Sequence, residues 1–154
     1  MIGEEIHQLV AKLYPICRSI TGEGVRQSLK IISDYIPVQV HELPTGTPVF
    51  DWTIPKEWNI KDAYIRNPQG QKIVDFQKSN LHVLNYSVPV TPKKLSLERL
   101  KAHLFTDPSH PQWIPYRTSY YKEQWGFSHQ PLFSLTVAHC PVRVRLEISS
   151  RARI

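Results

Sequence analysis

Apolar residues recur every three or four positions at the start of the chain, which is the spacing of one face of an α-helix. The apolar positions are Ile6, Leu9, Val10, Leu13, Cys17 and Ile20. This pattern predicts a helix over 5–20 with a kink or a restart near Tyr14, because Pro15 removes a backbone hydrogen bond and clashes with the preceding turn. A second helix is expected over about 24–35, and the Thr21 hydroxyl is expected to cap its N-terminus.

From residue 38 the pattern changes to the alternation of apolar and polar residues that is typical of β-strands. Strands are expected at 38–40, 62–66, 72–76, 81–84, 86–88 and 142–148. The second and third of these form a β-hairpin around the turn residues at 68–70. A short helix is expected over 96–104 with Ser96 as its N-cap, and the residues from Ser149 onward are expected to be frayed.

The helices come first and most strands follow, and this order predicts an α+β protein in which an N-terminal helical hairpin precedes a β-rich domain. With 154 residues, 41% hydrophobic and 21% charged, the chain resembles an ordinary globular domain in length and composition. No apolar run approaches the roughly 20 residues that a membrane span needs. The start of the chain is acidic and amphipathic and lacks the features of a secretory signal, so we expect a cytoplasmic protein without a membrane partner.

The net charge of +6 is unevenly distributed along the chain. The segment 141–154 carries four arginines against one acidic residue, Glu147, and supplies half of the net charge. A basic balance can indicate nucleic-acid partners, but no nucleic-acid-binding motif accompanies it. We therefore do not expect nucleic acid to be a partner.

The sequence contains none of the common catalytic or metal-binding motifs. Cys17 and Cys140 lie far apart without a second ligand at short spacing, which favours two free thiols over a disulfide or a structural zinc site. The seven histidines form no HExxH pair, no serine stands in a Gly-x-Ser-x-Gly context, and the six glycines form no nucleotide-binding loop. The residues alone therefore predict no catalytic residue, no metal ligand and no cofactor in this chain.

Four strings rich in aromatic residues and proline occur in a distinctive order. They are LYPICRSITGEG at 13–24, FDWTIPKEW at 50–58, NLHV at 80–83 and IPYRTSYY at 114–121, the last continuing to WGF at 125–127. Together they resemble the bacterial aminopeptidase-like proteins, often described as polysaccharide biosynthesis proteins with an aminopeptidase-like domain. The resemblance covers about residues 6–127.

The resemblance implies a place for each segment in a longer, zinc-dependent hydrolase. Residues 1–40 would be the first helices and strand of a zinc-peptidase α/β core, 41–127 a β-rich domain inserted into that core, and 128–154 a divergent basic tail. The family's metal motif, a Cys-His-Pro string followed by Asn-Asp-Asn, has no counterpart here, because Cys140 and Pro141 do not match it. Zinc is thus expected for full-length relatives, and the resemblance leaves open whether this chain is an enzyme.

Seven residues are candidates for binding substrate, and none of them is expected to be catalytic. They are Arg18, Asp51, Trp52, Trp58, His82, Tyr120 and Tyr121. The aromatic rings could stack on sugars or peptides, and a guanidinium could hold a substrate carboxylate through two hydrogen bonds. The alternative for each is structural: core packing for the tryptophans, a hydrogen-bonded histidine, and an ion pair or helix-end contact for Arg18. On a strand, Tyr120 and Tyr121 would face opposite ways, one toward the core.

Three hypotheses for the function remain open. The first is the N-terminal part of a metallo-aminopeptidase-like protein, inactive alone, whose β-rich domain shapes access to the active site. The second is a non-enzymatic binding module for a glycan, peptide or protein. The third is a non-functional truncated product, for which exposed apolar surface and self-association would be expected. The missing peptidase core is the partner implied by the first hypothesis.

Overall fold

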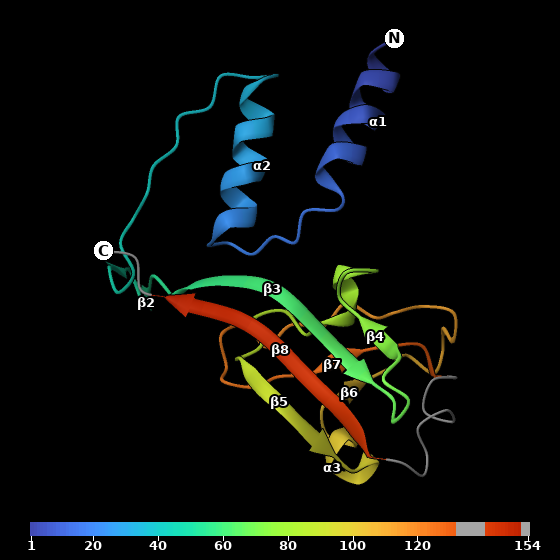
Figure 1. The fold of residues 1–154 in the computed structure, drawn as a ribbon. Coiled ribbons are helices and arrows are strands. Elements are labelled where there is room, and N and C mark those ends of the chain that lie inside the picture. Colours follow the sequence, from blue (N-terminus) through green and yellow to red (C-terminus); the bar gives the residue numbers. More distant parts are fainter. Residues whose placement is uncertain (132–140, 152–154) are drawn as a thin grey trace. The chain divides into compact units, whose positions relative to one another are not determined.

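The computed structural model describes residues 1–131 and 141–151, with side chains up to residue 149. The chain forms two compact units: unit 1 comprises Met1–Asn59 and the end of the chain, and unit 2 comprises Ile60–Ser149. Helices dominate unit 1 and strands dominate unit 2 (Figure 1). The predicted α+β class is therefore confirmed. Among the described residues, no helix is long and apolar enough to cross a membrane.

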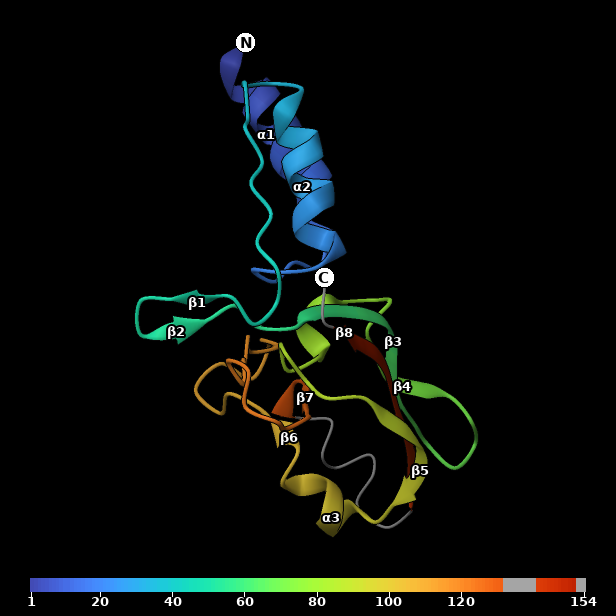
Figure 2. The same ribbon diagram turned by 90° about the vertical axis from the view of Figure 1, so that its left-hand side faces the viewer.

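Unit 1 begins with the predicted helical hairpin. Helix α1 is Ile2–Leu13 and helix α2 is Glu23–Ser33, and the two lie side by side in Figures 1 and 2. The Lys12 ammonium donates a hydrogen bond of 3.0 Å to the Tyr35 hydroxyl, which links the end of α1 to the residues after α2. The expected helix over 5–20 was too long: Pro15 terminates α1 rather than kinking it.

The N-terminus of α2 is capped by a distant residue and not by Thr21, so this prediction was wrong. The Asn59 side-chain oxygen accepts a hydrogen bond of 2.6 Å from the Glu23 amide. The Thr21 hydroxyl instead donates to the Lys56 carbonyl at 3.3 Å. Gly22 takes the capping position with φ of 105°, and a Cβ there would lie 2.5 Å from the Trp58 carbonyl oxygen. Only glycine allows this close approach.

The segment that follows α2 is irregular. The strand predicted at 38–40 is absent, because no strand of the described residues pairs with it and alternation alone does not satisfy backbone hydrogen bonds. A small hairpin comes next, in which β1 (Pro48–Val49) pairs with β2 (Trp52–Thr53). Phe50 lies at its tip, fully exposed, with φ of 53°.

Unit 2 is organised around a four-stranded sheet with the order β4-β3-β8-β5. Its strands are β3 (Glu57–Arg66), β4 (Lys72–Asp75), β5 (Val90–Leu95) and β8 (Val142–Arg151). The hairpin predicted at 62–66 and 72–76 is confirmed. The strand predicted at 142–148 is also confirmed, although it continues to Arg151 where fraying was expected. The basic C-terminal segment therefore supplies an inner strand of the sheet.

One face of this sheet carries the core. Ten buried apolar residues form it: Ala63, Ile65, Val74, Val83, Val90, Leu100, Phe127, Val142, Val144 and Leu146. In β8 the alternate residues Val142, Val144 and Leu146 point into the core, which leaves Arg143 and Arg145 on the other face. Each large apolar side chain buried in this way stabilises the fold by roughly 1.5–3 kcal/mol.

Shorter elements complete unit 2. They are the 3₁₀-helix Asn80–His82, helix α3 (Leu97–Lys101), and strands β6 (Leu104–Phe105) and β7 (Phe127–Ser128), which pair in parallel. Ser96 caps α3 as predicted, accepting from the Arg99 amide at 3.5 Å. The strands predicted at 81–84 and 86–88 were wrong, because Leu81 and His82 belong to the 3₁₀-helix and Tyr86 has φ of 66°.

Candidate functional site

Two loops of unit 2 are joined by backbone hydrogen bonds. The Asn85 amide donates to the Arg117 carbonyl at 2.9 Å, and the Ser119 amide donates to the Asn85 carbonyl at 3.0 Å. Further along, the Val88 amide donates to the Gln124 carbonyl at 3.0 Å. Segments 84–88 and 116–126 are thus fixed against each other, although about thirty residues separate them in the sequence.

Three tyrosines on these loops have left-handed backbone conformations. The φ angles are 66° at Tyr86, 45° at Tyr120 and 66° at Tyr121. A residue with a large side chain adopts this conformation rarely, at a cost of about 1–3 kcal/mol each, and such residues gather at functional sites. Hydrogen bonds next to these residues stabilise the strained backbone conformations. The Ser87 hydroxyl donates to the Leu84 carbonyl at 2.6 Å, and the Thr118 hydroxyl accepts from the Tyr120 amide at 3.1 Å.

The rings of Tyr86, Tyr120 and Tyr121 form one aromatic group, and Tyr116 is linked to the same loops through Asn85. We call these four residues the tyrosine cluster. The rings of Tyr86 and Tyr121 have centroids 4.1 Å apart, and Tyr120 meets Tyr121 edge-on at 5.7 Å. The hydroxyl of Tyr116 accepts a hydrogen bond of 3.4 Å from the Asn85 side chain. Tyr120 and Tyr116 are 67% and 62% exposed, so the cluster presents flat apolar faces with polar hydroxyls to solvent.

Sequence reasoning found only half of this cluster. It named Tyr120 and Tyr121 but expected them to face opposite sides of a strand, whereas turn geometry brings their rings together. It missed Tyr86 and Tyr116. Tyr116 belongs to the same string, IPYRTSYY at 114–121, as Tyr120, so the sequence could have indicated that it lies on the same loop. Tyr86 comes from the other loop, and only the hydrogen bonds between the loops place it beside Tyr121.

The histidines of unit 2 contact the backbone and neighbouring rings. His82, a predicted binding residue, has its Nδ1 atom 2.8 Å from the Ser128 carbonyl oxygen. His129 is buried, and this burial lowers the pKa of its imidazole, with a smaller lowering from His82 and an opposing effect of the Gln130 carbonyl. His103 stacks on Trp125 with ring centroids 3.6 Å apart, and its Nδ1 lies 2.9 Å from the Trp125 carbonyl oxygen. His82 thus makes the hydrogen bond that its structural alternative expected, while its role in binding stays a prediction.

The remaining predicted binding residues lie in unit 1 and do not converge on one site. The Arg18 guanidinium donates to the Leu13 carbonyl at 2.9 Å and contacts the Ser28 hydroxyl at 3.4 Å, which is the helix-end role named as its alternative. Asp51 and Trp52 belong to the β1–β2 hairpin and are exposed. Trp58 is only 6% exposed, so its ring is not available for stacking on a ligand.

Unit 1 also contains a cavity of about 170 Å³ between α2 and residues 40–57. Its central cation, Arg26, pairs with Glu23 and Glu42 at 3.2 Å each and with Glu57. Three carboxylates therefore surround one guanidinium, which makes this cavity a poor site for an anion. Over residues 1–131 and 141–151, no group of three histidine, cysteine or acidic side chains is arranged to hold a metal ion.

The tyrosine cluster lies within a region that matches a known family. A family profile described as a domain of unknown function (DUF2172) matches residues 57–145, which is more than half of the chain. The chain belongs to this family. The match continues past Phe127, where the resemblance found in the sequence was expected to end, and includes the first four residues of β8.

Two proteins from Clostridium acetobutylicum are similar to this chain in sequence or structure. One, described as "Putative polysaccharide biosynthesis protein with aminopeptidase-like domain", is 59% identical over 126 residues, covering 82% of this chain and 29% of the relative. The other is a crystal structure described as a "putative peptidase", with 50% identity and a TM-score of 0.94, covering 98% of this chain and 36% of that one. The resemblance to aminopeptidase-like proteins is thus confirmed, and the chain spans about a third of the length of these relatives.

Proposed function

We propose that this chain is part of a longer metallo-aminopeptidase-like hydrolase, in which unit 2 shapes the access of substrate to the active site. The tyrosine cluster carries this proposal, because it places exposed aromatic rings on a strained, hydrogen-bonded pair of loops. Aromatic faces of this kind stack on peptide side chains and on sugar rings. The names of the relatives support the peptidase class and a link to polysaccharide biosynthesis.

The small number of buried residues in unit 1 supports a partner that covers it, namely the remainder of a peptidase core. Only Gly22, Ser28 and Trp58 of residues 1–59 are buried. Apolar side chains remain exposed at Ile2, Ile6, Val10, Tyr14, Ile20, Ile36, Val40 and Leu43. Exposed apolar surface of this extent is also what the truncated-product hypothesis predicted. We assign it to an interface because the relatives are about three times as long as this chain and thus contain further protein that could cover it.

We further propose that zinc binds to other residues of the longer protein and that this chain alone does not hydrolyse peptides. The residues described here do not fit a zinc site, which needs three or four converging ligands, so no catalytic step is assigned to them. A cytoplasmic location, expected from the sequence, stays a prediction.

Two measurements on the 154-residue chain test the proposal. The first is the zinc content after dialysis against the metal, together with turnover of chromogenic amino-acid amides. We expect no tightly bound zinc and no turnover. Stoichiometric zinc together with turnover would contradict the inactive state that we propose, and would require ligands among residues that we regard as structural.

The second measurement is an NMR titration of the chain with short peptides and, separately, with oligosaccharides. Saturable shifts centred on Tyr116 and Tyr120 are expected, and substitution Tyr120→Ala should weaken the binding about 10-fold, the loss of one stacked ring. Tyr14→Ala is the matched control, since Tyr14 is an exposed tyrosine of unit 1. Equal loss in both variants, or no shift at the cluster, would remove the support for a substrate-facing role.

The alternative is a binding module without any role in hydrolysis. The exposed rings of Tyr116 and Tyr120 favour it as well, because they suit a glycan or peptide whether or not catalysis follows. Binding with micromolar or tighter affinity by this chain alone would favour the module, whereas weak binding is expected of a surface that only borders an active site.

A further inference from the structure

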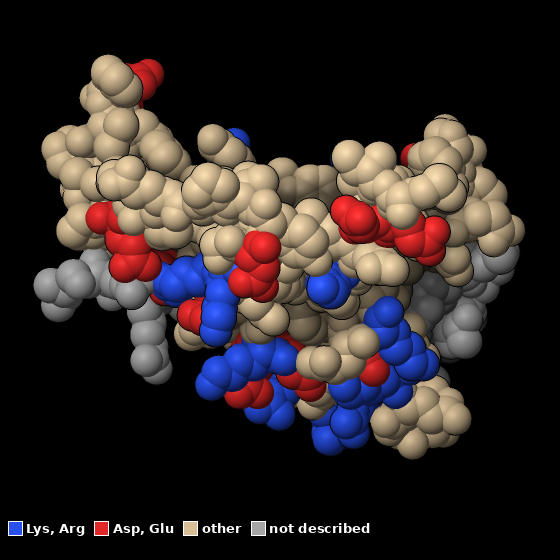
Figure 3. All heavy atoms as spheres, turned by 90° about the horizontal axis from the view of Figure 1, so that it is seen from above, with Lys and Arg blue, Asp and Glu red and all other residues tan. Residues whose placement is uncertain are grey.

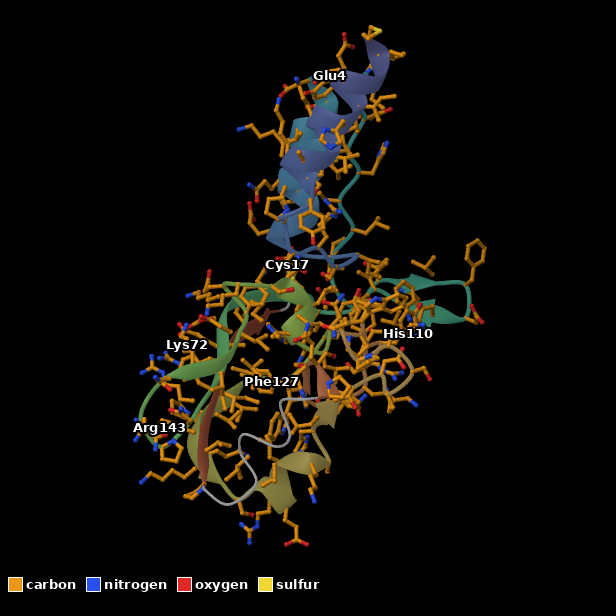
Figure 4. The ribbon with its side chains drawn as sticks, turned by 90° about the vertical axis from the view of Figure 1, so that its right-hand side faces the viewer. Glu4, Cys17, Lys72, His110, Phe127 and Arg143 are labelled. Carbon is orange, nitrogen blue, oxygen red and sulfur yellow. The ribbon has the colours of Figure 1, made fainter. Side chains whose placement is uncertain are left out.

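The outward face of the sheet in unit 2 carries more cations than acids. Strand pairing and alternation put five cations and three acids on this face. The cations are Arg66, Lys72, Lys94, Arg143 and Arg145, and the acids are Asp62, Asp75 and Glu147. Lys72 and Arg143 project to the side of the sheet away from Phe127 (Figure 4). Figure 3 shows lysine and arginine side chains gathered at one edge of the view, with a few acids among them.

All three acids of this face are paired with just two of the cations. The Lys72 ammonium lies 3.0 Å from an Asp75 oxygen and 3.6 Å from an Asp62 oxygen. The Arg145 guanidinium donates to Glu147 at 2.6 Å. A hydrogen bond with Tyr64, and then the Glu147 charge, raise the pKa of Arg145. The three other cations, Arg66, Lys94 and Arg143, are left without an acid on the face.

These three cations line a single pocket. The pocket has a volume of about 220 Å³ and is completed by Asn67, Pro68, Gly70 and Pro141 from the β3–β4 turn and the start of β8. No acidic side chain is part of its described lining. The segments that the structure does not describe, 132–140 and 152–154, contain no aspartate or glutamate in their sequence. No acidic side chain of those segments can therefore neutralise the pocket.

Two features of the pocket cost free energy when it is empty. Lys94 and Arg143 are directly opposite each other in the β5–β8 register, and like charges in that position repel. The Nε atom of Arg66 is buried without a hydrogen-bond partner among the described atoms. An anion that lies between the three side chains and accepts their hydrogen bonds removes the repulsion between Lys94 and Arg143.

We propose that this pocket binds a phosphate group, either free inorganic phosphate or the phosphate of a monoester. Three positive charges suit a doubly charged group better than a single carboxylate, and two guanidinium forks match the oxygens of phosphate. The volume of the pocket admits a phosphate with a small substituent. This proposal goes beyond the peptidase-related role above and does not depend on it.

Isothermal titration of the 154-residue chain with inorganic phosphate, at constant ionic strength set by chloride, tests the proposal. We expect saturable one-to-one binding, which Arg143→Gln and Lys94→Gln each weaken at least about 10-fold through loss of a charge-assisted hydrogen bond. Arg145→Gln is the matched control on the same strand and face, and it should weaken binding less than about threefold because its guanidinium is paired with Glu147. Circular dichroism checks that each variant folds, and Lys94→Gln, on an edge strand, serves if Arg143→Gln does not.

A parallel titration with glycerol phosphate separates the two sources of the group. Tighter binding of the ester than of inorganic phosphate would identify an organic phosphate as the ligand, and tighter binding of inorganic phosphate would identify the free ion. The proposal is overturned if phosphate does not bind, if Arg143→Gln and Lys94→Gln bind it as the unchanged chain does, or if only an oligonucleotide binds.

Discussion

Unit 1 and unit 2 differ in how much of their apolar surface they bury. Unit 2 has ten apolar residues in one continuous core, whereas three residues are buried among the first 59 of unit 1. Yet α1 and α2 of unit 1 are strongly amphipathic in sequence. An amphipathic helix with an exposed apolar face is suited to pack against another protein surface, which is the basis of the partner proposed above for unit 1.

The largest difference between the units is expected when a core side chain is truncated. Phe127 is 0% exposed and lies at the centre of the core of unit 2, so Phe127→Ala should lower the free energy of unfolding by about 3–5 kcal/mol. Urea denaturation followed by tryptophan fluorescence measures it. A loss of less than about 1 kcal/mol would mean that unit 2 is as loosely packed as unit 1.

A second test concerns the glycine at the N-terminus of α2 in unit 1. At Gly22 the φ angle is 105° and a Cβ would approach the Trp58 carbonyl to 2.5 Å, so Gly22→Ala should destabilise the start of α2 by roughly 1–3 kcal/mol. Hydrogen exchange of the α2 amides reports this locally. The control is Gly3→Ala, where a Cβ meets nothing within 4 Å and no change is expected. Equal exchange in both variants would mean that the Gly22 turn is not formed in solution.

The reactivity of the Cys17 thiol reports how well unit 1 excludes solvent from the segment between α1 and α2. Burial raises the pKa of Cys17 from about 9 to about 11, against a smaller lowering by Arg18. Alkylation by iodoacetamide at pH 8, in a Cys140→Ser variant, should therefore be about 10-fold slower than for a free cysteine. The neutral thiol favours folding below about pH 9, and this contribution is lost as the pH rises through 11. Reaction at the rate of a free thiol would show that unit 1 opens readily.

The smallest effect on stability is expected on the apolar face of α1. Val10 is 56% exposed, so Val10→Ser should change the free energy of unfolding by less than about 0.5 kcal/mol while reducing self-association of the chain. Analytical ultracentrifugation at several concentrations measures the association. A loss of stability comparable to that of Phe127→Ala would mean that the apolar face of α1 is already buried within this chain. It would contradict the difference in burial between unit 1 and unit 2.

The elements predicted correctly are those whose pattern and partner lie close together in the sequence. The β3–β4 hairpin has its turn between its strands, α3 has its Ser96 cap, and β8 alternates without interruption. Strand β5 was missed because Pro92, Lys93 and Lys94 interrupt its alternation, which an edge strand tolerates. The strand predicted at 38–40 had the right alternation but no partner among the described strands.

Local sequence therefore accounts for the class of the fold, for the helical hairpin, and for the resemblance to a peptidase-like family, because periodicity, proline and rare strings act over short distances. It did not predict the Asn59 cap, the pairing of Tyr86 with Tyr121, or the acid-free pocket of Arg66, Lys94 and Arg143. Each of these joins residues 28 or more positions apart. Their juxtaposition depends on strand order and loop pairing, which arise only when the core excludes water and the backbone satisfies its hydrogen bonds.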